Sequence, residues 1–138
     1  MEYVIFTILM VVILSFMFYG QIFLYINKYN NLKAIRIGSR TSQEAKQFYM
    51  AYMGIYQTGE QPHIQARLND IEFEPTIKPS NEEFMNFNLS PLAIKNLSLE
   101  TDHLKFAAKI SGQIVHTAIP LKSITLIVGQ SGIGFTMK

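Results

Sequence analysis

The sequence predicts a mainly β domain with one N-terminal helix, preceded by a single transmembrane helix. Three observations support this prediction. The chain opens with an uncharged run of 24 residues, a short stretch with helical spacing follows, and from residue 63 apolar residues alternate with polar ones. We therefore divide the chain into a transmembrane helix (1–27), a basic juxtamembrane connector (28–41) and a β domain (42–138).

The uncharged run extends from Tyr3 to Ile26. As a helix rising about 1.5 Å per residue it would be roughly 36 Å long, enough to cross a hydrocarbon core of about 30 Å. A cleaved signal peptide needs a basic start, a shorter apolar core and a small-residue cleavage site, whereas the only charge before this run is Glu2. We expect residues 3–26 to be an uncleaved membrane anchor.

The flanking charges predict the orientation of this anchor. None of the basic residues precedes the run, and five follow it closely: Lys28, Lys33, Arg36, Arg40 and Lys46. The positive-inside rule then places the N-terminus outside and the C-terminal domain in the cytoplasm. The absence of cysteine fits a reducing compartment, and a net charge of +2 is too small to indicate nucleic-acid binding.

Residues 41–57 have the pattern of a helix that Thr41 or Ser42 can cap. Aromatic and methionine side chains recur along it at helical spacing. Such a stripe is most often part of a core, but a helix this short and apolar could also pair with a copy of itself. The candidate self-association residues are Phe48, Tyr49, Tyr52, Met53 and Tyr56.

The remaining chain alternates with the period of β-strands. Ser111-Gly112 is expected to form the tight turn of a hairpin, and Pro91 to Asn96 a short turn between two strands. Such a series of short strands with hairpin-length gaps indicates a small antiparallel sheet curled toward a barrel. The expected strands are 63–68, 71–74, 85–89, 97–99, 104–110, 115–119, 124–128 and 135–137.

Nothing in the sequence has the spacing of a catalytic or metal site. The histidines at 63, 103 and 116 are far apart and form no helical ligand pair. The turn "GQSGIG" (129–134) lacks the lysine of a phosphate loop and the last glycine of a nucleophile elbow. We therefore expect no enzymatic activity, no metal and no cofactor.

Several segments together carry a resemblance to a known family. They are "FYMAYMGIYQTGEQPHI", "FMNFNLSPLAIKNLSLETDHLKFAAKISG" and "AIPLKSITLIVGQSGIG", whose order and spacing hold over roughly residues 43–138. The chain here resembles stringent starvation protein B, a family of bacterial adaptors that deliver tagged proteins to the ClpXP protease. The matching positions are Asn88, Leu89, Ser90, Pro91, Ala93, Ile94, Asn96, Leu97, Phe106, Ala108, Lys109, Gly112, Pro120, Leu121, Gly132 and Gly134.

The resemblance implies a small Sm-like, partly open β-barrel behind one helix. It also implies a dimer formed through that helix and a groove for extended peptides, notably the tag added by the tmRNA ribosome-rescue system. The acidic tail through which the family binds its AAA+ unfoldase has no counterpart after Lys138. Carried over to this chain, the peptide-binding candidates are Phe106, Ala108, Ile110, Phe135 and Thr136.

We therefore expect a single-pass protein of the bacterial inner membrane that binds protein or extended-peptide partners without catalysis. A homodimer and an AAA+ unfoldase are the partners that the resemblance implies. The alternative is an accessory subunit of a larger membrane complex, in which the helix and the β domain serve as packing surfaces. The aromatic and methionine-rich anchor favours that alternative.

Overall fold

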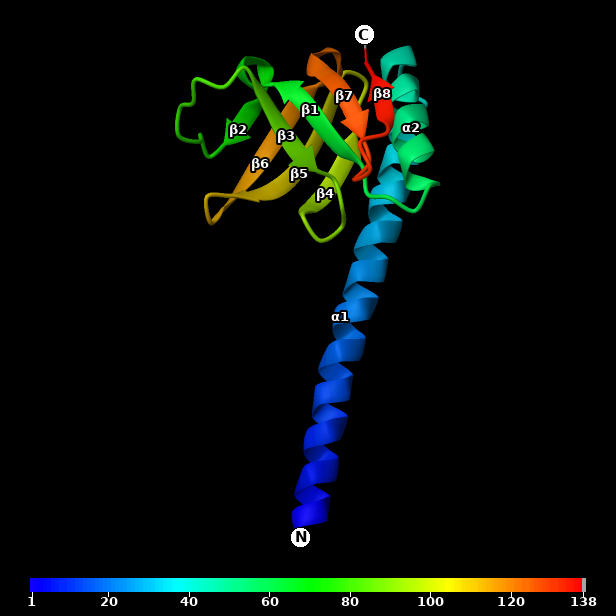
Figure 1. Ribbon diagram of the computed structural model, residues 1–138, viewed down its shortest axis with the longest axis vertical. Coiled ribbons are helices and arrows are strands. Elements are labelled where there is room, and N and C mark those ends of the chain that lie inside the picture. The colour runs from blue at the N-terminus through cyan, green and yellow to red at the C-terminus, as the bar shows by residue number, and fades with distance from the viewer. Residues whose placement is uncertain (138) are drawn as a thin grey trace.

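The computed structural model describes residues 1–137, and a single long helix, α1 (Glu2–Gly38), opens the chain. Its N-terminal part extends far from the rest of the protein, as Figure 1 shows. The helix is long and apolar enough to cross a membrane. It does not stop at the predicted boundary: most of the expected connector, 28–41, continues the same helix.

The last third of α1 is part of the folded domain because one of its faces packs against the strand β4 (Ile94–Leu99). Asn31, Ile35 and Gly38 are buried on that face, at spacings of four and three residues. A Cβ atom at Gly38 would overlap the carbonyl oxygen of Leu99 and lie 2.6 Å from the Cβ of Leu99. A glycine is therefore what allows the helix to come this close to the strand.

The second helix, α2 (Gln43–Tyr56), lies beside the upper end of α1 in Figure 1. Ser42 caps it, since its hydroxyl oxygen accepts a hydrogen bond from the backbone N–H of Ala45 at 3.0 Å. Lys28 of α1 places its Nζ 5.3 Å from the ring centroid of Tyr56 on α2. The two helices thus meet both through apolar packing and through this cation–π contact.

Two four-stranded antiparallel sheets follow, and within residues 1–137 they do not close into one barrel. Sheet A has the order β3-β1-β7-β8, and sheet B the order β2-β6-β5-β4. The predicted apolar helix and the antiparallel β region are thereby confirmed. The other strands are β1 (His63–Arg67), β2 (Glu72–Glu74), β3 (Phe84–Asn88), β5 (His103–Ile110), β6 (Gln113–Pro120), β7 (Ile124–Val128) and β8 (Gly134–Thr136).

The β5–β6 hairpin forms at the predicted turn. Ile110 pairs with Gln113, and the two residues between them, Ser111 and Gly112, have φ angles of 51° and 80°. Positive φ at both central positions is the geometry of a type I′ turn, whose twist matches that of the flanking strands.

The expected turn at 91–96 is shorter in the structure, because β4 already begins at Ile94. Asn96 lies inside this strand with a φ of 57°, and the pairing with β5 shifts register between Lys95 and Ser98. Asparagine adopts this left-handed conformation more readily than most residues, so it can bend a strand through a bulge. The turn-forming residue that the pattern indicated thus bends the strand instead of ending it.

The core lies between the two sheets and beneath both helices. The ring of Phe87 on β3 meets the ring of Phe106 on β5 edge-on, at a centroid distance of 5.2 Å. Burying each such side chain contributes on the order of 2 kcal/mol, so many of them are needed to offset the cost of ordering the chain. Fully buried members include Ile35, Phe48, Ile64, Leu89, Leu104, Ile119 and Ile127.

Candidate functional site

A groove of about 670 Å³ lies between α2 and the edge strand β8. We call it the α2–β8 groove. Met50 and Phe135 are its large exposed apolar side chains, and Phe135 is 47% exposed. The lining residues are Gln47, Met50, Ala51, Phe135, Thr136 and Met137.

The position of β8 at the end of sheet A leaves one of its edges open to a further strand. Two backbone hydrogen bonds to β7 and its flanking residues show which groups of β8 face inward, and so which face the open edge. The N–H of Met137 donates to the carbonyl oxygen of Thr125 at 2.9 Å, and the N–H of Gly129 donates to that of Ile133 at 3.0 Å. Because the direction alternates along an antiparallel strand, the N–H and C=O groups of Gly134 and Thr136 point away from β7.

Glycine in α2 allows β8 to lie close to the helix. A Cβ atom at Gly54 would come within 3.0 Å of the ring of Phe135, so this ring packs directly against the helix backbone. The ring therefore covers the floor of the groove while its remaining surface stays exposed. An apolar groove beside unpaired backbone groups is the arrangement that binds an extended peptide by strand addition.

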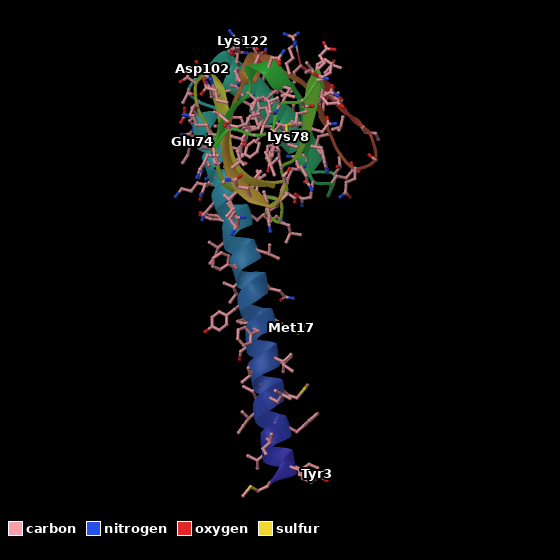
Figure 2. All side chains as sticks on the ribbon, turned by 90° about the vertical axis from the view of Figure 1, so that its left-hand side faces the viewer. Tyr3, Met17, Glu74, Lys78, Asp102 and Lys122 are labelled. Atoms are coloured by element: carbon pink, nitrogen blue, oxygen red, sulfur yellow. The ribbon has the colours of Figure 1, made fainter. Side chains whose placement is uncertain are left out.

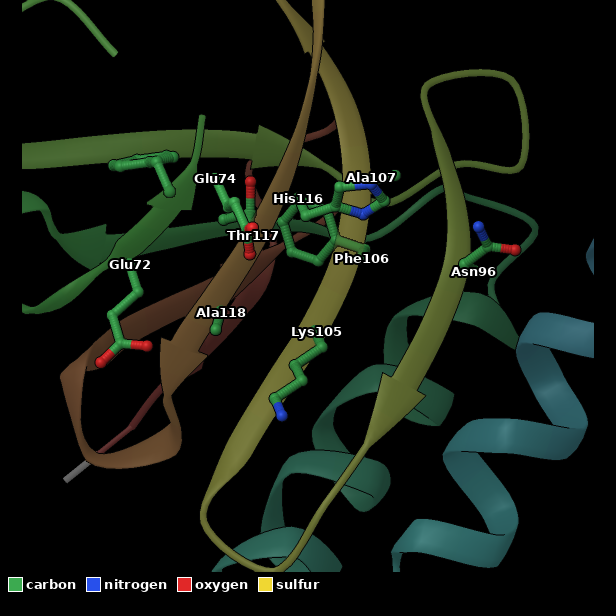
Figure 3. A pocket seen from close by; sticks show the side chains of 10 residues that line it. Glu72, Glu74, Asn96, Lys105, Phe106, Ala107, His116, Thr117 and Ala118 are labelled. Atoms are coloured by element: carbon green, nitrogen blue, oxygen red, sulfur yellow. The ribbon is translucent and has the colours of Figure 1, made fainter. Parts of the chain in front are cut away.

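A second groove, of about 540 Å³, lies over sheet B and is shown in Figure 3. Glu72 and Glu74 on β2 stand at one side, and Lys105 on β5 stands across the groove from them. Ala107 and Ala118, whose side chains are short, also line it. The backbones of β5 and β6 are paired on both sides, so this groove has no free strand edge along its centre.

Most polar side chains of this second groove are exposed, and the exception, Thr117, is 2% exposed with no hydrogen-bond partner for its hydroxyl among residues 1–137. Lys105 pairs with Glu100 at 3.1 Å, and both side chains are about half exposed. His116 lies opposite Glu74 in the β2–β6 register. Among the described residues 1–137, no group of three or more histidine, aspartate or glutamate side chains could hold a metal ion.

The structure divides the predicted peptide-binding residues between two sheets. Phe135 and Thr136 lie in the α2–β8 groove on sheet A, whereas the three predicted residues of β5 belong to sheet B. Phe106 is only 3% exposed, and its ring packs on Phe87. Ala108 and Ile110 are half-buried against the same core. The structure therefore does not bring the five residues together into one groove.

The aromatic stripe of α2 faces the core. Phe48 and Tyr52 are buried, while Tyr49, Met53 and Tyr56 are half-buried against the same cluster. Burial raises the pKa of Tyr52 to about 12, with a smaller contribution from Tyr56. Self-association through this stripe could use only the surface that Tyr49, Met53 and Tyr56 leave exposed, since Phe48 and Tyr52 are buried in the core.

Met50 was not among the predicted site residues, although the sequence contains a signal for it. It follows Lys46 and Gln47 at helical spacing, so it is an apolar residue on the otherwise polar face of α2. Gly134 was missed because its role lies in its backbone, which no side-chain pattern records.

Two of the histidines, His63 and His103, and the glycine-rich turn have structural partners. His63 Nδ1 lies 3.0 Å from the carbonyl oxygen of Gln61. His103 bonds Asp102 at 2.7 Å, and this bond lowers the pKa of the Asp102 carboxyl. Ser131 donates both its N–H (2.7 Å) and its hydroxyl (3.0 Å) to the carboxylate of Glu60, so its hydroxyl holds the turn.

No protein-family model matches the chain, and no curated protein matches it either.

Proposed function

We propose that the chain is a membrane-anchored, non-enzymatic peptide-binding protein. In this proposal α1 holds the β domain at a bilayer, and the α2–β8 groove receives an extended segment of another protein. The observation that carries the proposal is the open edge of β8 beside an apolar groove.

The peptide would extend sheet A by one strand. Its backbone would pair with the outward-facing groups of Gly134 and Thr136, and alternate side chains would enter the groove beside Met50 and Phe135. Backbone pairing supplies affinity for almost any sequence, while the apolar lining favours small or apolar side chains at every second position. Such a site suits an unfolded tag better than a folded surface.

The resemblance to stringent starvation protein B extends this proposal to an adaptor role and to a location in the cell. The bound segment would be a degradation tag, and the AAA+ unfoldase of ClpXP would be the recipient. The anchor would concentrate tagged proteins at the cytoplasmic face of a bacterial inner membrane, since tethering raises the effective concentration of both partners. The same proposal includes an Sm-like architecture for the two sheets and a homodimer of the chain.

Fluorescence anisotropy tests the peptide site directly. The full chain in detergent micelles is titrated against a fluorescein-labelled tmRNA tag peptide. We expect saturable binding that weakens at least about tenfold in Met50→Arg, which places a charge in the groove, and in Thr136→Pro, which removes an outward N–H; tenfold corresponds to about 1.4 kcal/mol. Thr76→Arg, which adds the same charge in the exposed β2–β3 loop, is the matched control.

Two results would count against this site. If the tag peptide shows no saturable binding, the peptide-binding function is wrong. If Ala108→Arg abolishes binding while Met50→Arg and Thr136→Pro leave it intact, the peptide lies along β5, as the resemblance implies, and the α2–β8 groove is not the site.

The alternative function, an accessory subunit of a membrane complex, is supported by one feature of α1. Gln21 places an exposed amide within the apolar run, and such an amide can bond to a neighbouring transmembrane helix. Affinity purification in mild detergent separates the two proposals. A stoichiometric membrane partner without protease favours the subunit, whereas an unfoldase with tagged substrates favours the adaptor.

A further inference from the structure

The loop between β3 and β4 is fixed against α1 at the end of the apolar run. The Nδ2 of Asn27 donates hydrogen bonds to the carbonyl oxygens of Pro91 (2.7 Å) and Ile94 (3.3 Å). Both bonds join residues more than sixty positions apart in the sequence and are partly buried. The height of this loop along the helix is therefore set by the fold.

From this fixed loop Leu92 projects outward, with 80% of its surface exposed. It lies between two hollows that the loop forms with α1. One, of about 450 Å³, is lined from the helix by Gly20, Phe23 and Leu24. The other, of about 470 Å³, adds Tyr25 and Lys28. Apolar side chains of the anchor thus contribute to the lining of both hollows.

The helix geometry gives the depth of Leu92. Gly20 lies about 10 Å along the axis from Asn27, toward the N-terminus. Gly20 belongs to the uncharged run 3–26, and Leu92 lines the same hollow as Gly20. If residues 3–26 span the hydrocarbon core, Leu92 reaches the boundary between headgroups and acyl chains.

Other loops of the domain face the same way. In Figure 1 the β3–β4, β5–β6 and β7–β8 connections all lie at the end of the domain nearest the free part of α1. Outside α1 the described residues include five exposed large apolar side chains, and three of them lie at this end of the domain. Leu92 and Ile133 belong to the β3–β4 and β7–β8 connections, and Ile114 is the second residue of β6, next to the β5–β6 turn. The opposite end, far from Tyr3 in Figure 2, carries Asp102 and Lys122.

Charge at this end complements a lipid surface. Lys28 and Lys95 line the two hollows, and Lys109 precedes the β5–β6 turn; all three are exposed. Exposed lysines beside an apolar tip match anionic headgroups beside acyl chains. A protein partner would have to fit two hollows that are continuous with the surface of the anchor, whereas lipid fills them without a specific shape.

We infer that this end of the β domain rests on the bilayer that holds α1, with the Pro91–Leu92 tip inserted at the acyl-chain boundary and phospholipid filling the two hollows. The inference rests on the membrane anchor proposed above and is independent of peptide binding. Its consequence is a fixed orientation: the domain stands on the membrane instead of moving freely on a tether.

Site-specific fluorescence tests the contact, because the chain contains no cysteine and single cysteines can be labelled without background. The full chain with Leu92→Cys carries an environment-sensitive NBD label in nanodiscs of phosphatidylcholine and phosphatidylglycerol. Ile13→Cys in the middle of the run and Lys122→Cys at the far end are the references. We expect acyl-chain spin labels to quench the probes at 13 and 92 but not at 122, with blue-shifted emission at 92.

The outcomes distinguish the inference from the anchor on which it rests. If the probe at 92 behaves like that at 122 while the probe at 13 is quenched by lipid, the anchor stands and the bilayer contact is wrong. If the probe at 13 is also accessible to water-soluble quenchers, the anchor itself fails. If the probe at 92 is shielded from both lipid and water, a protein surface covers the tip, which also overturns the inference.

Discussion

At the scale of single residues, Tyr52 shows how the helix α2 is coupled to the core. Tyr52 is 2% exposed, and its ring stacks on that of Tyr56 at a centroid distance of 6.3 Å. Burial favours the neutral phenol over the charged phenolate. The pKa of Tyr52 rises from the ordinary 10.0 to about 12 for this reason. The charged phenolate is thus disfavoured in the folded state relative to the unfolded one.

This shift predicts alkaline destabilisation. The contribution of neutral Tyr52 is complete below pH 10, the unfolded value, and is lost as the pH rises through 12, the folded value. Two pKa units correspond to at most about 3 kcal/mol. Tyr52→Phe, which cannot ionise, should lose less stability between pH 10 and 12 in urea unfolding followed by circular dichroism.

The control for this prediction is Tyr29→Phe, at an exposed position, which should keep the wild-type pH profile. Equal alkaline slopes for Tyr52→Phe and the wild-type chain would show that Tyr52 is solvated and not packed in the core.

The residue scale is also where the sequence is least informative about the site. Alternation correctly places Phe106 on one face of its strand, but it does not show that a second sheet covers that face. The stripe with Phe48 and Tyr52 was open to two interpretations for the same reason, and the structure shows it facing the core. Periodicity identifies a face, whereas the neighbour of that face depends on contacts distant in sequence.

At the scale of elements, α1 combines two environments in one continuous helix. Its apolar part is exposed throughout, whereas its last third supplies the fully buried Ile35 to the core. Residues 28–41 look like a polar connector because only one of their large apolar side chains, Ile35, is fully buried, while Leu32 is partly buried against the same core. The spacing of Asn31, Ile35 and Gly38 was the available signal, and it is too weak to separate a docked helix from a linker.

The packing of α1 against β4 predicts which truncated chains fold stably. A fragment of residues 27–138 keeps the packed third of α1 and should unfold cooperatively. A fragment of residues 42–138 loses Ile35, whose removal alone should cost about 2–4 kcal/mol, and uncovers the edge strand β4. Thermal unfolding and size-exclusion chromatography should show the shorter fragment to be less stable and prone to aggregate.

A pair of point variants separates packing from fragment length. Ile35→Ala should destabilise the full chain by several kcal/mol, while Ile37→Ala, at an exposed position of the same helix, should change its stability by less than about 0.5 kcal/mol. Equal stabilities for the two fragments would mean that residues 27–41 do not stabilise the β domain and that the contact of α1 with β4 is weak.

At the scale of the whole molecule, the continuous helix and the bonds of Asn27 fix the β domain at one height above the apolar run. The sequence predicted the division into anchor and β region from hydropathy and period alone. It could not predict their relative placement, because the bonds of Asn27 to Pro91 and Ile94 join residues 64 and 67 positions apart, which no local pattern records. The α2–β8 groove has the same origin, since Met50 and Phe135 are 85 residues apart in the numbering.

The last prediction concerns the side of the membrane on which the domain lies. Basic residues follow the apolar run and none precedes it, so the positive-inside rule places the β domain in the cytoplasm. In intact cells a membrane-impermeant maleimide should label Glu2→Cys, whereas Lys122→Cys should be labelled only after lysis. The opposite pattern would put the groove on the outer side, where no cytoplasmic unfoldase could receive a bound peptide, and would contradict the adaptor role.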